Sequence, residues 1–371
     1  MKFDERPFIA IWETTQACDL ACRHCRASAT PARDLGELDT AEGMRLLDAL
    51  AAARVPLVVL TGGDPAKRPD LVALVSHGVS RGLGMALTPS ATPLVTSELI
   101  HALASAGLSR LAISIDAPDS ETHDAFRGVP GSFERSLVIL RDANAAGIRT
   151  QINTSLHSGN IHALRRMTSI VEQSGSVLWS VFFVVPTGRA GVQLLPSASE
   201  VEAALDQLAG IAASARFSVK TTAAPHYRRV LLQRKKAGAA HVSAGTHGAP
   251  ALRVNDGRGF LFVSHRGEIF PSGFLPIGCG NVRSDDVMEV YRKHPTFVEL
   301  RDPDGLHGKC GACEYRSVCG GSRARAYALT GDRRASDPLC AYVPAGFDGA
   351  PEIWDGTRRR RALPMLQSGG S

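Results

Sequence analysis

Short apolar runs alternate with longer amphipathic stretches from Pro7 to about Lys220. The runs are rich in β-branched residues, which is typical of buried strands, and the stretches between them carry apolar residues at helical spacing. Six β/α units in succession predict a parallel sheet curled into a partial, TIM-like (β/α)6 barrel. Strands are expected at 8–12, 55–60, 85–87, 111–115, 149–154 and 181–185, and helices from Thr40, Asp70, Ser97, Ser132 and Ile161.

The pattern changes after Lys220. Residues 221–258 are rich in Ala, Gly, His and Arg and are expected to form a linker or a substrate-contacting segment. A β-hairpin with a glycine turn is predicted over 260–270. The predicted organisation is a barrel at 1–220, the linker at 221–258, a small C-terminal domain at 259–345 and a flexible tail at 346–371.

Composition narrows the class of protein. Apolar residues make up 44% and charged residues 21%, as in ordinary globular proteins. We expect a cytoplasmic protein without a membrane partner, because no apolar run is long enough to span a bilayer and Met1–Pro7 lacks a signal sequence. The net charge of +6 is scattered along the chain, so small anionic substrates fit it as well as nucleic acid does. We expect no nucleic-acid partner.

The eight cysteines form two groups. Three lie within residues 18–25 and five between 279 and 340. In a reducing compartment, such clustering indicates metal ligation rather than disulfides.

The first group, Cys18, Cys22 and Cys25, has C-x3-C-x2-C spacing and follows the first predicted strand. Three thiolates on one loop can hold three irons of a [4Fe–4S] cubane and leave the fourth iron open. The open iron can chelate S-adenosylmethionine and pass an electron into its sulfonium. Structural zinc is the alternative, but zinc prefers four ligands and C-x2-C pairs.

This motif, with His24 before its last cysteine, resembles that of the radical S-adenosylmethionine (radical SAM) superfamily. Further fragments that resemble the family follow at the predicted strand ends, in the family's order. Asp64 stands where the family usually has Glu. The resemblance covers roughly residues 8–190 and implies S-adenosylmethionine contacts from His24, Gly62, Gly63, Asp64, Ser114, Asp116, Arg127, Asn153, Pro186 and Gly188.

The second group has C-x2-C-x5-C-x20-C spacing. Four thiolates can fully ligate a cubane or a zinc ion. The segment resembles the SPASM extension of radical SAM enzymes, which implies an auxiliary [4Fe–4S] cluster for electron transfer. Ser272 and Ser322 stand where fuller SPASM domains have cysteines, so one auxiliary cluster is expected, and the leftover Cys279 is expected to be a buried small residue. The predicted ligands are Cys310, Cys313, Cys319 and Cys340.

Three segments, at 220–229, 259–276 and 319–332, together resemble the tetrapyrrole-modifying branch of the superfamily. This implies a haem-type ring from which carboxylates or side chains are removed. The expected reaction is hydrogen abstraction from the carbon β to a propionate carboxylate, followed by loss of carbon dioxide; removal of an acetate side chain by the same start is equally open. Arg228, Arg229 and Arg253 are candidate propionate clamps, and His226 or His265 a candidate iron ligand. Tyr227 belongs to the same segment, and Phe260, Phe262 and Phe274 are candidates to face the ring.

Two other functions remain open. The layout is also similar to that of maturases of ribosomally made peptides, which usually carry an N-terminal peptide-binding module. Only seven residues precede the first predicted strand, so a peptide substrate implies a separate binding partner. A non-catalytic haem or iron–sulfur carrier is disfavoured by the intact first cysteine group. For either enzyme the resemblance implies an electron donor of the flavodoxin or ferredoxin type.

Overall fold

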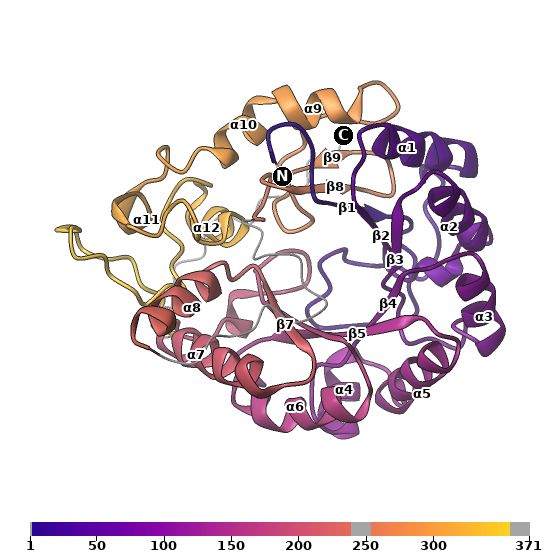
Figure 1. Cartoon of the computed structure of the whole chain (residues 1–371), viewed down its shortest axis with the longest axis horizontal. Coiled ribbons are helices and arrows are strands. Elements are labelled where there is room, and N and C mark those ends of the chain that lie inside the picture. The colour runs from indigo at the N-terminus through magenta and orange to yellow at the C-terminus, as the bar shows by residue number, and fades with distance from the viewer. Residues whose placement is uncertain (1, 239–253, 357–371) are drawn as a thin grey trace.

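A curled parallel sheet surrounded by helices dominates the computed structural model, which describes residues 2–238 and 254–356 (Figure 1). Its first seven strands are β1 (Ile9–Glu13), β2 (Leu57–Thr61), β3 (Gly84–Leu87), β4 (Arg110–Ser114), β5 (Arg149–Leu156), β6 (Leu178–Phe183) and β7 (Ser218–Thr222). The helices between and after them are α1 (Thr40–Ala52), α2 (Leu71–Ser80), α3 (Ser97–Ser105), α4 (Ser120–Arg127), α5 (Ser132–Ala145), α6 (Leu164–Gln173), α7 (Ala198–Ser214) and α8 (His226–Lys236). Short 3-10 turns lie at Pro65–Lys67, Ile161–Ala163 and Val192–Leu194.

The predicted hairpin forms, and it extends the barrel. Strand β8 (Phe260–Val263) pairs in parallel with β1, with Phe262 opposite Ile11, and β9 (Ile269–Phe270) turns back antiparallel to β8. The sheet order is β7-β6-β5-β4-β3-β2-β1-β8-β9. The segment expected to begin a separate domain therefore satisfies the free edge of β1 with main-chain hydrogen bonds.

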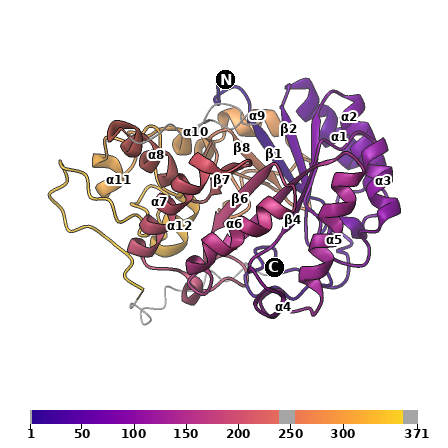
Figure 2. The ribbon, with the colours of Figure 1, turned by 60° about the horizontal axis from the view of Figure 1, so that its bottom comes forward.

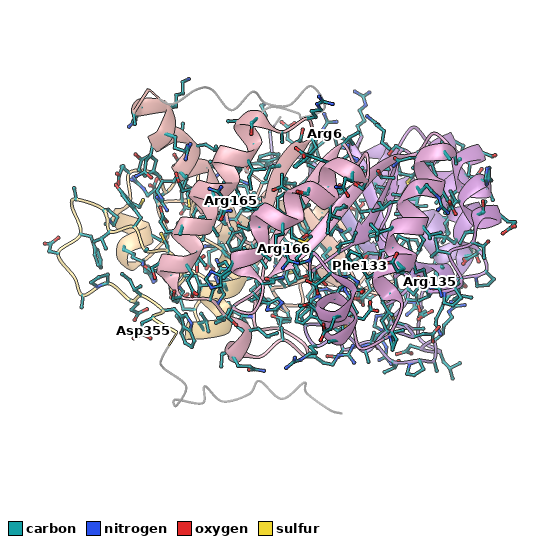
Figure 3. The ribbon with its side chains drawn as sticks, turned by 90° about the horizontal axis from the view of Figure 1, so that it is seen from below. Arg6, Phe133, Arg135, Arg165, Arg166 and Asp355 are labelled. Atoms are coloured by element: carbon teal, nitrogen blue, oxygen red, sulfur yellow. The ribbon has the colours of Figure 1, made fainter. Side chains whose placement is uncertain are left out.

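The helices cover the outer face of the sheet (Figures 1 and 2). Because side chains alternate across a strand, one set of apolar residues packs against these helices and the other faces the barrel interior. Trp12 belongs to the outer set, and a Cβ on Gly43 of α1 would lie 2.3 Å from its ring, so glycine permits this close packing. Phe133 is buried, whereas Arg135, Arg165 and Arg166 on α5 and α6 are exposed (Figure 3).

The C-terminal helices lie along two sides of the barrel (Figure 1). Helices α9 (Val287–Lys293) and α10 (Pro295–Arg301) lie beside β8, β9 and α1, while α11 (Gly308–Ala312) and α12 (Arg323–Thr330) lie toward α8. Tyr291 joins α9 to the rest of the chain: its hydroxyl donates to the Phe3 carbonyl at 2.6 Å and accepts from the Gly259 amide at 3.0 Å.

Two expectations about the connecting segments need correction. Residues 221–238 are not an irregular linker, because they contain the end of β7 and all of α8. The start of the expected tail is docked: the Trp354 amide donates to Pro338, its carbonyl accepts from Ala198, and its side chain packs against the core. Residues 239–253, with Arg253, and 357–371 lie outside the described part of the chain. No helix within the described ranges is long and apolar enough to cross a membrane.

Candidate active site

The first cysteine group lies on the loop that follows β1. Cys18 and Cys22 are buried and Cys25 is half-buried. Each sulfur accepts a hydrogen bond: Cys18 from the Leu20 amide at 3.3 Å, Cys25 from the Ala29 amide at 3.4 Å, and Cys22 from an arginine described below. Donors directed at sulfur stabilise thiolates, which are the form that ligates iron.

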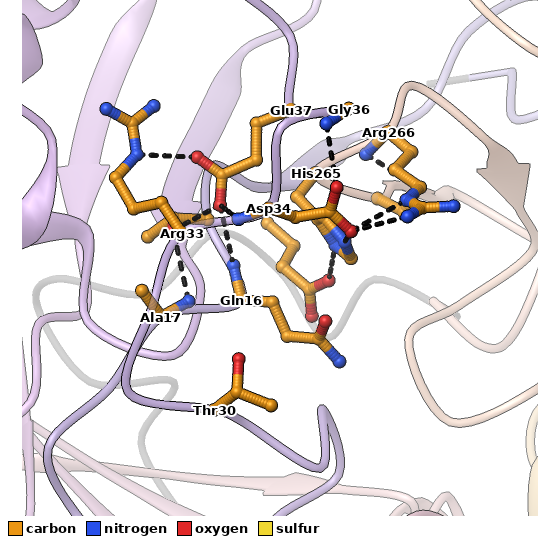
Figure 4. Close-up of polar contacts among 12 residues, drawn as sticks. Gln16, Ala17, Thr30, Arg33, Asp34, Gly36, Glu37, His265 and Arg266 are labelled. Atoms are coloured by element: carbon orange, nitrogen blue, oxygen red, sulfur yellow. Dashed lines mark hydrogen bonds and ion pairs between the residues drawn. The ribbon is translucent and has the colours of Figure 1, made fainter.

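Two carboxylates, the buried Glu37 and the half-buried Asp34, hold this loop in place (Figure 4). Glu37 accepts from the Thr15 hydroxyl, from the Gln16 amide at 3.3 Å and from Arg33 at 2.7 Å. Neighbouring Asp34 pairs with Arg266 at 2.6 Å, so the turn after β8 is tied to the same loop. The contacts leave the loop little freedom, which suits a site that must hold sulfurs in fixed positions.

Glycines at the ends of β2 and β6 let these strands approach the loop. A Cβ on Gly63 would lie 2.4 Å from the Ala17 carbonyl oxygen, and one on Gly62 2.4 Å from that of Thr15. Gly188 has φ +64°, and a Cβ there would lie 2.4 Å from the Cys25 carbonyl oxygen. The structure thus places these predicted residues, with Pro186 nearby in sequence, against the cysteine loop.

The Asp64 carboxylate is hydrogen-bonded to other groups of the protein. It is fully buried, accepts from the Thr92 hydroxyl at 2.6 Å and from the Ala66 amide at 3.1 Å, and burial raises its pKa. The Ser90 hydroxyl donates to the Gly63 carbonyl at 2.7 Å and lies 3.3 Å from the Cys18 sulfur. The Asp64 carboxylate therefore braces the ends of β2 and β3 instead of pointing a free acceptor at a ligand.

Arg127, at the end of α4, joins the cysteine loop to the barrel. Its Nη1 donates to the Cys22 sulfur at 3.7 Å, and its Nη2 lies 2.6 Å from the carboxylate of Asp116. Asp116 follows β4 and also accepts from the Ser155 amide at 2.7 Å. Burial alone would raise the pKa of Asp116, but the charge of Arg127, the neighbouring imidazoles and the Ser155 amide together outweigh it and hold the pKa at about 2. The pair is therefore ionised at neutral pH.

Three aromatic rings stack above the loop. His24 lies 4.4 Å from Phe126, and Phe126 lies 4.2 Å from His157, with nearly parallel planes. Burial lowers the pKa of His24 to about 4, so its imidazole is neutral. Phe126 and His157 were not predicted, and only their place in the sequence, beside Arg127 and just after β5, could have indicated them.

Ser114 and Asn153 are direct neighbours across β4 and β5. Both point to the inner face of the barrel, because the residues that precede them, Ile113 and Ile152, pack into the outer core and side chains alternate along a strand. Asn153 accepts a hydrogen bond from Gln151 at 2.7 Å. Residues from distant parts of the sequence thus lie side by side on the inner face, and their contact with S-adenosylmethionine stays a prediction.

Cys310, Cys313, Cys319 and Cys340 of the second group line one hollow. Arg229, Lys309 and Arg316 also line it, so cationic side chains surround the sulfurs. His226 lines it too, but burial lowers the pKa of its imidazole. The Tyr315 and Gly321 amides donate to Cys313 and Cys319, each at 3.4 Å, and Arg323 donates to Cys310 at 3.8 Å. Cys279 lies apart in the hydrophobic core, where burial raises its pKa to about 11.

The predicted substrate residues do not gather at one place. His226 is fully buried, with Nε2 3.1 Å from Asp337, at the second cysteine hollow and not at an open ring site. Arg229 is paired with both oxygens of Glu202 and lies over the Tyr342 ring, so it is not free to clamp a propionate. The Tyr227 hydroxyl donates to the Leu208 carbonyl. The Arg228 guanidinium donates to the Val254 and Val318 carbonyls. The last of the five predicted residues, His265, lies elsewhere and is described next.

His265 belongs to a network that the sequence did not reveal. Its Nδ1 lies 2.8 Å from Glu13 at the end of β1, and the other Glu13 oxygen pairs with Arg26, the residue after Cys25. Arg26 also lies 4.7 Å over the Phe262 ring and donates to the Gly273 carbonyl at 3.4 Å. This network connects the cysteine loop to the hairpin and the chain that follows it.

Comparison with known proteins agrees with this arrangement. Residues 12–165 match the model of the radical SAM superfamily. The chain is 40% identical over 337 residues, 90% of this chain and 92% of the relative, to an AdoMet-dependent heme synthase of Nitratidesulfovibrio vulgaris. The chain belongs to the radical SAM superfamily.

Two further comparisons bear on fold and substrate. A PqqA peptide cyclase of Methylocella silvestris is 29% identical, with 90% of this chain and 87% of that protein covered. The crystal structure of Streptococcus suis SuiB bound to S-adenosylmethionine superposes with a TM-score of 0.71 at 16% identity, covering 91% of this chain and 78% of that one. The latter confirms the fold: a radical SAM partial barrel.

As a radical SAM enzyme, the protein uses S-adenosylmethionine and a [4Fe–4S] cluster. The donor set fits that cluster, because three sulfurs on one braced loop each accept a hydrogen bond. Within the described residues, no three His, Cys, Asp or Glu side chains converge on a point as they would around a single metal ion. A cubane needs no such convergence, since each thiolate binds its own iron.

Proposed function

We propose that this radical SAM enzyme oxidatively decarboxylates a side chain of a haem-type tetrapyrrole in the cytoplasm. The observation that carries the proposal is the 40% identity, over nearly the whole of both chains, to an AdoMet-dependent heme synthase. The PqqA peptide cyclase aligns over a similar length at 29% identity. The similarity is therefore greater to the enzyme named for haem than to the one named for a peptide.

Cys18, Cys22 and Cys25 are the proposed ligands of the S-adenosylmethionine-binding cluster. Gly62, Gly63 and Gly188 lie against this loop, and Ser114 and Asn153 are neighbours on the inner face of β4 and β5, so these five are the proposed neighbours of S-adenosylmethionine. When bound, the cluster and S-adenosylmethionine supply an organic radical that can remove a hydrogen atom from an unactivated carbon. An external donor of the flavodoxin or ferredoxin type is the proposed source of the electron.

The protein's own groups keep this site rigid and dry. Arg127 holds a positive charge beside Cys22 and is itself fixed by Asp116. His24, Phe126 and His157 cover the loop with stacked rings that carry no net charge. Together they exclude water, which protects a reactive radical from side reactions.

The net change in the substrate defines what else the enzyme must provide. A propionate side chain loses one hydrogen atom from the carbon β to its carboxylate, then carbon dioxide and one electron, and becomes a vinyl group. That electron needs an acceptor close to the substrate. Cys310, Cys313, Cys319 and Cys340 are the proposed ligands of an auxiliary, SPASM-type [4Fe–4S] cluster, and Arg229, Lys309 and Arg323 offset the negative charge of four thiolates.

The test is a reaction of the anaerobically reconstituted enzyme with a reductant, S-adenosylmethionine and iron-coproporphyrin, followed by mass spectrometry. We expect a product that has lost carbon dioxide and two hydrogens for each modified propionate. A parallel reaction with a PqqA-type precursor peptide tests the second candidate function. If only the peptide is modified, the tetrapyrrole proposal is wrong.

A further inference from the structure

The inner wall of the barrel has two unlike halves. On β1, β2 and β8, most residues opposite the outer core are apolar, with Glu13 and Thr61 at the strand ends as the exceptions, and Ile11, Leu57, Val59 and Phe260 among them are only partly buried. On β4 to β7 most of the corresponding residues are polar, although Ala112, Leu178 and Phe182 also face inward. This second set comprises Arg110, Arg149, Gln151, Asn153, Ser180, Ser218 and Lys220.

Register places the cations of the polar half. Lys220 on β7 lies directly opposite Ser180 on β6, and both face inward because Trp179 and Val181 pack into the outer core. Arg110, at the amino end of β4, lies opposite Arg149 on β5. Lys220 is exposed, so solvent reaches the inner face there, yet surrounding protein and the charges of Arg110 and Arg228 lower its pKa to about 8.

These cations have no carboxylate partner. Among the described residues, no ion pair or hydrogen bond involves the Lys220 amine, and the buried Nε of Arg110 has no acceptor. The Ser180 hydroxyl beside Lys220 is fully buried and also lacks a partner. The two inward-facing acids, Glu13 and Asp116, are already paired with Arg26 and Arg127.

Such an arrangement costs stability. Like charges opposite each other on neighbouring strands repel, and buried polar groups without partners lose hydration without compensation. The barrel fold itself does not require these unpaired cations, because apolar residues stand at most of the inward-facing positions of β1, β2 and β8. An incoming anion would supply the missing partner.

We propose that Lys220 and Arg110, with the Ser180 hydroxyl, bind a side-chain carboxylate of the substrate on the inner face of the barrel. The inference rests on the proposed function and specifies how that substrate is recognised. A tetrapyrrole combines an apolar ring with carboxylates on its edges, and this wall combines an apolar half with a cationic half.

The position in the sheet separates this carboxylate from the reacting one. Ser180 and Lys220 share a register row with Asn153 and Ser114, and Lys220 is three strands from Ser114, or about 14 Å across the sheet at 4.8 Å per strand. Arg110 is four residues before Ser114, or about 13 Å along β4 at 3.3 Å per residue. Ser114 is at the carboxyl end, with Asp116 and Arg127 beside the cysteine loop. The cations therefore hold a carboxylate remote from the chemistry and orient the ring, so that another side chain faces the radical source.

The test compares two ligands that differ in charge. The full-length reconstituted enzyme is titrated with iron-coproporphyrin and with its neutral tetramethyl ester, and the dissociation constants are read from absorbance. Lys220→Met is expected to weaken binding of the acid by about tenfold or more, the worth of a charge-assisted hydrogen bond, and binding of the ester by less than about twofold. Arg110→Met should act in the same direction, and Lys220→Arg should retain binding of the acid.

Arg135→Met, which removes an exposed arginine from the outer helix α5, is the matched control and should change neither constant. The thermal midpoint of Lys220→Met should equal or exceed that of the wild type, since an unpaired cation is removed. Equal binding of the acid by wild type and Lys220→Met, or an equal loss for acid and ester, overturns this inference while the proposed function stands. If the wild type binds neither porphyrin, the proposed function fails as well.

Discussion

The guanidinium of Arg127 donates a hydrogen bond to the sulfur of Cys22 at 3.7 Å. The same guanidinium is held 2.6 Å from Asp116, so a residue after β4 controls the charge beside the cysteine loop. Hydrogen bonds to a cluster's sulfurs help set its reduction potential. Arg127 is therefore a positioning and tuning residue for the proposed cluster.

Replacing Arg127 should change both the reduction potential of the proposed cluster and the unfolding free energy of the protein, for two different physical reasons. Arg127→Met leaves Asp116 buried and unpaired, which should cost about 3–5 kcal/mol of unfolding free energy, and lowers the cluster's reduction potential. Adding Asp116→Asn should restore most of the stability but not the potential. Thermal unfolding and a redox titration followed by electron paramagnetic resonance check both. An unchanged potential in Arg127→Met would contradict the tuning role.

A methyl group on Gly63 should displace the cysteine loop. The Cβ of Gly63→Ala would lie 2.4 Å from a carbonyl oxygen of that loop, and main-chain atoms cannot move aside cheaply. We expect the variant to lose most of the first cluster, or about four of about eight irons per chain. Gly210→Ala on α7 is the control, because its Cβ meets nothing within 4 Å and alanine favours helix. Iron analysis that finds both variants fully loaded would refute the close approach.

The Glu13–His265 pair should make stability depend on pH. Burial alone would lower the pKa of His265, but the hydrogen bond to Glu13 and the charges of Glu13, Asp34 and Glu37 together outweigh burial and raise the pKa above 6.5. A group whose pKa is raised on folding contributes stability below its unfolded pKa and loses it as pH rises through the folded one. The stability advantage of the wild type over His265→Gln should therefore shrink as pH rises above 6.5, in urea unfolding at several pH values. An advantage that grows over this range would show that the pair is not charged as described.

The second cysteine group should account for half of the iron. Replacing Cys310 and Cys313 by Ala should lower the content from about eight irons per chain to about four. Cys279→Ala removes a thiol from the hydrophobic core and should leave all the iron in place. Zinc bound at the second group in the wild type would exclude its role in electron transfer.

The periodicity of apolar residues was sufficient to predict the barrel, because apolar strand runs and helix-capping residues are local features of the sequence. It did not reveal β7 or α8, since Ser218–Thr222 carries polar inward residues in place of an apolar run and α8 is strongly basic. The cysteine spacing predicted both of the proposed cluster sites. The Glu13–Arg26–His265 network depends on β8 pairing with β1, a contact between residues about 250 apart in sequence that no local pattern encodes.

The substrate residues show the same limit. Arg229 was a reasonable propionate clamp until the structure placed Glu202 beside it. Lys220 and Arg110 gave no signal in sequence, because a cation without a partner can be recognised only when its neighbours are known.

The most direct test of the central claim follows one hydrogen atom. Iron-coproporphyrin carrying deuterium on the propionate carbon next to the ring is incubated with reduced enzyme and S-adenosylmethionine, and the 5′-deoxyadenosine formed is analysed by mass spectrometry. We predict deuterium in the 5′-deoxyadenosine together with vinyl-bearing porphyrin. Deuterium-free 5′-deoxyadenosine with unchanged porphyrin would contradict the account.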